Sequence, residues 1–168
     1  MINYLKILLI CLIFPFFILS CNSNFINTLK SPLKIKKPSL SLYTNNLIKT
    51  INNSANSNLT ISIFYSKLGK NKTIPKEYME NISSFFNSLK PEYFLDYSTS
   101  NLDTKNPEYR LTVYLNEKSI FVIDILNDKY ITIYPWDGSY EPDLIDISNL
   151  HTRTNLFNIA DYLIKYHN

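Results

Sequence analysis

The clearest pattern in the chain is the alternation of apolar and polar side chains between Tyr109 and Trp136. Alternate residues of an extended chain face the same side, so this period of two is typical of half-buried β-strands. Three such runs follow one another, separated only by polar residues at 116–118 and 127–128. The pattern predicts a three-stranded meander, whose central strand, apolar on both sides, is covered on both faces.

Patterns elsewhere predict the remaining elements. Apolar residues at helical spacing predict three amphipathic helices, at 40–51, 75–89 and 154–164. Pro75 suits a first helical position and Thr154 is a plausible N-cap. Further alternation predicts strands at 59–65 and 93–97, whereas 69–73 and 98–107 are interpreted as a turn and a loop. Because strands outnumber crossovers, we expect an α+β fold, with a mostly antiparallel sheet and helices packed on one face.

The beginning of the chain has the pattern of a secretory signal. A short positively charged start is followed by an unbroken apolar run over 7–19 and by the small residue Ser20. This run is shorter than the roughly 20 residues that a membrane-spanning helix needs. Residues 1–20 are therefore expected to be a signal peptide outside the folded domain.

The four residues Ile18-Leu19-Ser20-Cys21 resemble the lipobox of bacterial lipoproteins. The resemblance implies that the Cys21 thiol receives a diacylglyceryl group before the signal is cleaved on its amino side. Membrane lipid would then be a partner, at the extracytoplasmic face. The alternative is an ordinary secreted protein cut near Ser20, with Cys21 left as a free thiol that is open to oxidation. Because Cys11 lies in the signal, neither outcome leaves a pair for an intramolecular disulfide.

Charge is divided unevenly along the chain. From Asn22 to Lys76 there are nine lysines and no acidic residue, whereas the chain from Glu77 onward has seven Lys or Arg against fourteen Asp or Glu. We interpret residues 21–38 as the lipidated cysteine and a flexible basic tether, followed by a single domain at 39–168. Anionic lipid attracts each nearby lysine by about 1 kcal/mol, which favours contact of Lys30–Lys37 with the membrane surface. A basic stretch without a binding fold, in an exported chain, argues against nucleic acid as a partner.

One segment after the meander collects the residue types of a binding site. The stretch 134–143 holds the only tryptophan of the chain together with tyrosines and carboxylates. Aromatic rings and carboxylates bind cationic or carbohydrate ligands. The candidate ligand contacts are Trp136, Asp137, Tyr140, Glu141 and Asp143. The alternative is that Trp136 fills the core and that Asp137 and Gly138 simply form a turn.

Catalytic and metal-binding signatures are absent from the sequence. The spacing of Asp137, Ser139, Glu141 and Asp143 begins like a calcium loop, but Pro142 stands where that loop requires glycine. There is no glycine-rich phosphate loop, nucleophile elbow or paired cysteine motif. We therefore expect no metal, no cofactor and no catalytic residue. The rival hypothesis, a cell-envelope hydrolase or an inhibitor of one, requires His151 to converge with the acidic segment 137–146.

Taken together, several features resemble small uncharacterised lipoproteins of clostridial bacteria, a family with a domain of unknown function. These features are the lipobox, the bias toward Asn, Lys, Ile and Tyr, and the stretch Tyr134-Pro135-Trp136-Asp137-Gly138 ahead of a carboxy-terminal helix. The resemblance implies a location and no activity. The leading hypothesis is a non-enzymatic, membrane-anchored binding or accessory module, with a cell-envelope ligand or protein as its partner.

Overall fold

The computed structural model describes residues 37–53 and 58–166. The chain divides into Met1–Lys36 and Lys37–Asn168, and the description below concerns the second unit. The expected signal peptide, Cys21 and nearly all of the expected tether lie outside the described residues.

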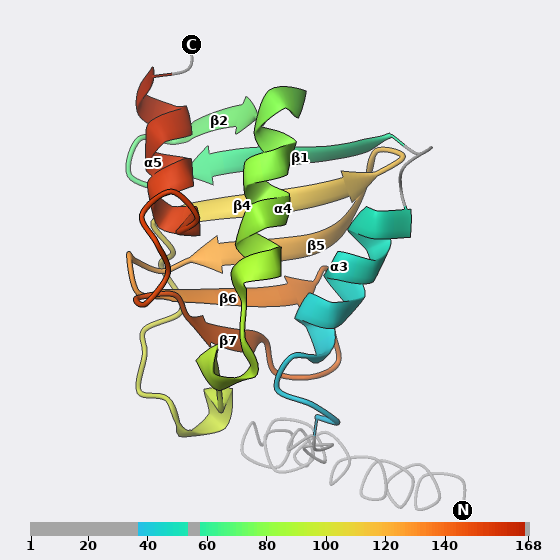
Figure 1. Ribbon diagram of the computed structural model, residues 1–168, viewed down its shortest axis with the longest axis vertical. Helices are drawn as coiled ribbons and strands as arrows, with labels where there is room; N and C mark the ends of the chain where they lie inside the picture. Colours follow the sequence, from blue (N-terminus) through green and yellow to red (C-terminus); the bar gives the residue numbers. More distant parts are fainter. Residues whose placement is uncertain (1–36, 54–57, 167–168) are drawn as a thin grey trace, which may run out of the picture. The chain divides into compact units, whose positions relative to one another are not determined.

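A seven-stranded antiparallel sheet forms the framework of the domain, as Figure 1 shows. Its strand order is β2-β1-β4-β5-β6-β7-β3, and the sheet is open, with β2 and β3 as its edges. The strands are β1 (Leu59–Tyr65), β2 (Lys70–Thr73), β3 (Phe94–Leu95), β4 (Tyr109–Leu115), β5 (Lys118–Ile125), β6 (Tyr130–Pro135) and β7 (Asp143–Asp146). The predicted α+β fold class is confirmed.

The predicted meander is β4, β5 and β6, which pair in sequence order at the centre of the sheet. Asn116 and Glu117 connect β4 to β5 with φ angles of 49° and 66°, the positive values that a tight two-residue hairpin turn requires. At the next turn the side-chain oxygen of Asn127 accepts hydrogen bonds from the backbone N–H groups of Lys129 and Tyr130. These bonds stabilise a turn that has no glycine.

Three helices among the described residues cover one face of the sheet: α3 (Leu42–Asn53), α4 (Met79–Ser88) and α5 (Leu156–Tyr166). Each turns an apolar stripe toward the sheet, with Leu47, Phe85 and Leu163 among the buried side chains. These helices form one core cluster with the strand residues Ile123 and Ile133. The predicted helices and their packing on one face are confirmed.

The central strand β5 is buried on both faces, as its sequence predicts. Ile123 belongs to the core beneath the helices, whereas Val122 and Asp124 alternate with it and are also almost fully buried. Thr132 and Leu144 on neighbouring strands are the cross-strand partners that continue this second face, and both are buried.

Three strands differ from the sequence-based expectation. Lys70–Thr73 was expected to be a turn and is the edge strand β2, because polar, mostly exposed side chains do not prevent backbone pairing with β1. The strand β7 is not predicted: it begins at Asp143, the last residue of the segment interpreted as a binding loop, and its apolar run is too short to show a period. The expected strand 93–97 is reduced to the two residues of β3, which pair with β7.

Asn155 replaces Thr154 as the residue that caps the last helix. Its side-chain oxygen accepts a hydrogen bond from the backbone N–H of Phe157, and its amide group donates to the carbonyl oxygens of Asp128 and Ile147. Thr154 instead bonds back to the carbonyl of His151. Asparagine is favoured here because one buried side chain serves both the helix and two loops.

Candidate functional site

The predicted binding segment divides into an exposed turn and a buried strand. Trp136 is 70% exposed and Asp137 beside it is also exposed, whereas Tyr140 and Glu141 are partly buried. Asp143 is the first residue of β7 and its side chain is wholly buried. The alternative that Trp136 fills the core is wrong. The five candidate residues therefore do not form one surface, because Asp143 faces the interior.

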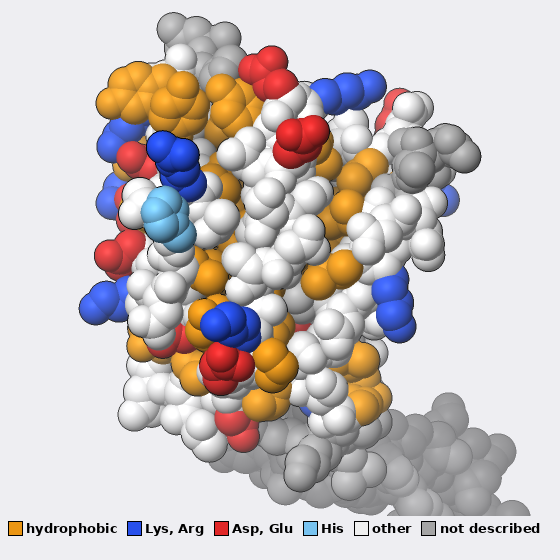
Figure 2. Space-filling view, viewed as in Figure 1, with side chains coloured by type: hydrophobic (Ala, Val, Ile, Leu, Met, Phe, Trp, Pro, Cys, Tyr) orange, Lys and Arg blue, Asp and Glu red, His pale blue; other side chains and the backbone are white. Residues whose placement is uncertain are grey.

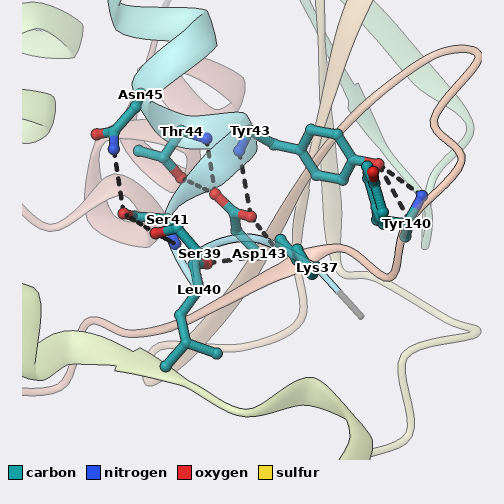
Figure 3. Close-up of polar contacts among 9 residues, drawn as sticks. All are labelled: Lys37, Ser39, Leu40, Ser41, Tyr43, Thr44, Asn45, Tyr140 and Asp143. Carbon is teal, nitrogen blue, oxygen red and sulfur yellow. Dashed lines mark hydrogen bonds and ion pairs between the residues drawn. The ribbon is translucent and has the colours of Figure 1, made fainter. Parts of the chain in front are cut away.

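Asp143 caps the amino-terminal end of α3 from the neighbouring strand (Figure 3). One carboxylate oxygen accepts hydrogen bonds from the backbone N–H and the hydroxyl of Thr44, both at 2.7 Å. The other accepts a longer bond, 3.3 Å, from the backbone N–H of Tyr43. These bonds satisfy N–H groups that the first turn of a helix leaves without partners, and the negative charge suits the positive end of the helix dipole. Asp143 therefore holds α3 against the sheet.

Lys37 supplies the opposite charge to this carboxylate. Its ammonium group forms an ion pair with Asp143 and also donates to the carbonyl oxygen of Leu40 at 3.4 Å. It lies 5.1 Å from the centre of the Tyr43 ring, within the range of a cation–π interaction. The Lys37 side chain is only 13% exposed. The expected tether of 21–38 includes this residue, but its side chain packs in the domain.

Tyr43 fastens the turn that follows β6 to α3. Its hydroxyl accepts a hydrogen bond from the backbone N–H of Tyr140 at 2.8 Å and donates to the carbonyl oxygen of the same residue at 3.3 Å. A Cβ atom added at Gly138 would lie 3.1 Å from this hydroxyl and from Pro135, so glycine permits the close approach. The exposed Trp136 therefore belongs to a turn that hydrogen bonds hold against α3.

A groove of about 440 Å³ lies between α3 and the segment that begins in α4 and ends at β3. The wall of the groove on the α3 side is mainly polar, and the opposite wall is apolar. Figure 2 shows hydrophobic groups at the surface between α3 and α4. The lining residues are Ser39, Leu40, Ser41, Thr44, Asn45, Ile48, Phe86, Leu89, Pro91 and Phe94. None of these side chains is ionisable. The groove therefore offers hydrogen bonds and apolar contact, but no acid or base for catalysis.

A second polar network lies on the sheet face opposite the helices. Arg110 stands directly across from Asp124 in the β4–β5 pair and donates two hydrogen bonds to its carboxylate, at 2.6 and 3.0 Å. Tyr134 donates a third, at 2.8 Å. The pKa of the Tyr134 hydroxyl is raised to about 12, mainly by burial and next by the hydrogen bond to Asp124. The hydrogen bond to Asp124 also raises the pKa of Arg110 above its usual value.

Sequence reasoning missed this network, although a signal was present. Asp124 is a single carboxylate in an apolar run, and Arg110 occupies the matching face of the strand before it. A cross-strand ion pair is the usual way to satisfy such a carboxylate. Because both carboxylate oxygens are bonded, the network stabilises the sheet and leaves no base free for catalysis.

His151 and Asp137 lie toward opposite ends of the β6–β7 pair. The backbone N–H of Ile147 bonds to the carbonyl of Lys129, so the chain leaves β7 at the end of the sheet where β6 begins. Asp137 follows the other end of β6. His151 is exposed, and its Nδ1 accepts a bond from the backbone of Arg153. The part of the chain that the structure describes holds no cluster of three or more His, Cys, Asp or Glu suited to a metal ion.

No helix in residues 37–53 or 58–166 has the length and apolar character needed to cross a membrane.

Comparison with known proteins supports the resemblance to uncharacterised clostridial proteins. The domain of unknown function DUF4883 matches residues 37–160. The fold is similar to the crystal structure of a candidate lipoprotein from Clostridium perfringens, with a TM-score of 0.65 and 27% sequence identity. That match covers 77% of this chain and 98% of the other. No curated protein matches the chain. The matched region spans the whole sheet, α3, α4 and the beginning of α5, and the chain therefore belongs to the DUF4883 family.

Proposed function

We propose that this protein is a lipoprotein, anchored through acylated Cys21, that displays its α+β domain on the extracytoplasmic face of the membrane. The observation that carries the proposal is the lipobox-like Ile18-Leu19-Ser20-Cys21 directly after an apolar run. The similarity of the fold to that of a candidate lipoprotein from Clostridium perfringens supports the same anchoring. Each buried methylene contributes about 0.8 kcal/mol, so two acyl chains hold a protein on a membrane far more firmly than one.

The domain acts as a non-enzymatic binding or accessory module. Its proposed contact surface, called here the Trp136 turn, consists of Trp136, Asp137, Tyr140 and Glu141. Exposure of a large aromatic side chain on a turn that is bonded to α3 supports this assignment, because preorganised aromatic residues bind with little loss of conformational freedom. Asp143 contributes by fixing the turn and α3 relative to each other, not by touching a ligand.

The rival proposal of a hydrolase, or an inhibitor of one, has less support. Of its two components, His151 lies toward the end of the β6–β7 pair away from Asp137, and Asp146 of the acidic segment 137–146, at the same end as His151, accepts a hydrogen bond from the backbone N–H of Ser148. In each of the buried carboxylates Asp124 and Asp143, both oxygens accept hydrogen bonds from the protein. No specific observation favours catalysis over binding.

Substitution of Cys21 tests the anchor. The Cys21→Ser protein should lose its acyl chains and either leave the membrane fraction or keep its signal uncut. Cys11→Ser is the matched control, since Cys11 lies within the expected signal and should be dispensable. Unchanged processing and membrane association of the Cys21→Ser protein would exclude the lipoprotein assignment.

Binding to separated cell-wall and membrane fractions tests the contact surface. The full chain, solubilised in detergent, should be retained by at least one fraction, and Trp136→Ala or Asp137→Ala should weaken that retention. Leu68→Ala is the matched control, because Leu68 is also highly exposed but lies between β1 and β2. Retention that is equal in all variants would rule out the Trp136 turn as the contact surface.

A further inference from the structure

The point at which the chain enters the domain is fixed. Lys37 is the first described residue, and its ion pair with Asp143 ties it to β7. From Cys21 to Lys37 the chain has 16 peptide links (37 − 21). However these residues are arranged, 16 links span at most about 58 Å. If Cys21 is anchored as proposed, Lys37 always lies within this distance of the bilayer.

The Trp136 turn lies beside this point of entry. Asp143, the partner of Lys37, is bonded to the first turn of α3, and Tyr43 of the same helical turn is bonded to Tyr140. Gly138 approaches the Tyr43 hydroxyl so closely that a Cβ atom there would lie 3.1 Å from it. Anchoring therefore keeps the Trp136 side chain, like Lys37, within reach of the membrane.

Leu40 adds an exposed apolar side chain to the same end of the domain. It is 45% exposed, and Figure 3 shows its side chain pointing away from the Asp143 network. Two further exposed aromatic side chains, Tyr162 and Tyr166, belong to α5. That helix lies beside the edge strand β2, where Lys72 donates to the carbonyl of Leu163. The exposed tyrosines are thus on the side of the sheet away from β7.

We propose that the partner of the Trp136 turn is the lipid–water interface of the membrane that holds Cys21, with Trp136 inserted among the headgroups and Leu40, next to Lys37, facing the same bilayer. This inference rests on the proposed lipid anchor. Tryptophan is enriched at membrane interfaces because its ring is apolar while its N–H group still bonds to water or headgroup oxygens. Asp137, which is exposed next to it, remains in water and limits the depth of insertion.

The polar groups around the turn favour lipid over a carbohydrate ligand. A sugar site needs several convergent hydrogen-bonding groups around an aromatic ring. Here the backbone N–H and carbonyl of Tyr140 are bonded to Tyr43, and both oxygens of Asp143 are bonded to α3. These polar groups of Tyr140 and Asp143 are thus already bonded within the protein and do not converge on the Trp136 ring, which suits the non-directional contacts of an interface.

Fluorescence of the acylated full-length protein in phosphatidylcholine vesicles tests the inference. Trp136 is the only tryptophan of the chain, so the emission reports this side chain alone. Relative to the Cys21→Ser protein with the same vesicles, we expect emission at shorter wavelength and weaker quenching by aqueous acrylamide. We also expect stronger quenching by lipids brominated near the headgroup end of their acyl chains.

A relocated tryptophan provides the matched control. In the double variant Trp136→Phe with Leu68→Trp, the reporter moves to the β1–β2 turn, where Leu68 is 62% exposed. Its emission should remain that of a ring in water. A shift equal to that of Trp136 would indicate non-specific association and would overturn the inference.

The same preparation separates failure of this inference from failure of the proposed function. Mass spectrometry that finds no acyl group on Cys21 contradicts the lipoprotein proposal itself. An acylated protein whose Trp136 stays open to acrylamide and untouched by brominated lipid overturns the interface proposal alone. The Trp136 turn would then face water and be open to a soluble ligand.

Discussion

Replacing Asp143 with alanine should destabilise the whole domain, although Asp143 belongs to a short strand near one edge of the sheet. The change removes the acceptor for three hydrogen bonds and the partner of Lys37. It leaves two backbone N–H groups at the start of α3 without a protein partner. It also leaves a mostly buried ammonium group without its counter-charge.

The size of this effect follows from the burial of the network. Loss of a helix N-cap costs about 0.5–2 kcal/mol, and loss of one partner from a buried ion pair costs about 3–5 kcal/mol. These effects overlap, and the Lys37 side chain can regain some water because it is 13% exposed. We expect a loss of about 3–4 kcal/mol in the free energy of unfolding. Domains of this size are stable by about 5–15 kcal/mol, so the change is a large fraction of the total.

Urea unfolding followed by circular dichroism measures the loss. With m-values of about 1–3 kcal/mol per molar urea, the midpoint should fall by at least about 1 M. Asp137→Ala is the matched control, because this carboxylate is exposed in the same turn and should change stability by less than about 0.5 kcal/mol. Hydrogen exchange of the Tyr43 and Thr44 amides gives a local reading of the same network.

Two results would contradict this reasoning. A loss below about 1 kcal/mol for Asp143→Ala would mean that water replaces the carboxylate at little cost. Unchanged protection of the Tyr43 and Thr44 amides would mean that α3 is held by its apolar face alone. Asp143→Asn, which keeps an acceptor of the same shape, should cost less than alanine if the geometry of the cap matters.

Three further predictions concern other hydrogen bonds in the structure. Tyr43→Phe should speed hydrogen exchange at the Tyr140 amide and cost about 1 kcal/mol, since one hydroxyl makes both bonds. Arg110→Met should cost about 2–3 kcal/mol in urea unfolding, because it leaves Asp124 buried without its cation; Arg110 is itself 43% exposed, which keeps the cost below that of a fully buried pair. The pKa of the Tyr134 hydroxyl is raised from about 10 to about 12, so the unfolded chain releases this proton at lower pH than the folded protein does. The free energy of unfolding should therefore fall as pH rises from about 10 to about 12. The Tyr134→Phe variant should show a smaller fall over this range.

A specific experimental result would contradict each of these predictions. Equal exchange at Tyr140 in the Tyr43→Phe protein would show that the turn is not fastened by the hydroxyl. Lys67→Met breaks the exposed pair with Glu108 and should cost much less stability than Arg110→Met, so an equal cost for the two variants would show that burial is irrelevant. An alkaline profile that Tyr134→Phe leaves unchanged would place the titration elsewhere.

Local patterns predict most of the sheet and the helices. The apolar runs around Ile123 and Ile133 are easy to recognise because these strands are buried, and burial selects apolar side chains. The same logic fails for β2, since an edge strand paired through its backbone needs no apolar face. It also fails for β7, whose four residues are too few to reveal a period.

The role of Asp143 could not be predicted from its neighbours in sequence. Its side chain is bonded to Thr44, 99 residues away, and no local pattern records such a partner. Trp136 shows the reverse problem. Composition favours burial of a lone tryptophan, but Pro135 ends the strand just before it, and the turn leaves the ring exposed.

The distance in sequence between α3 and its cap affects how the domain folds. Synthesis proceeds from the amino terminus, so α3 is complete long before Asp143 exists, and closing so large a loop carries an entropic cost. A chain that ends before Asp143 has every residue of α3 but no carboxylate to begin it. The first helix of the domain can therefore dock fully only after nearly the whole chain has been made, which gives truncated chains an uncapped, protease-sensitive start.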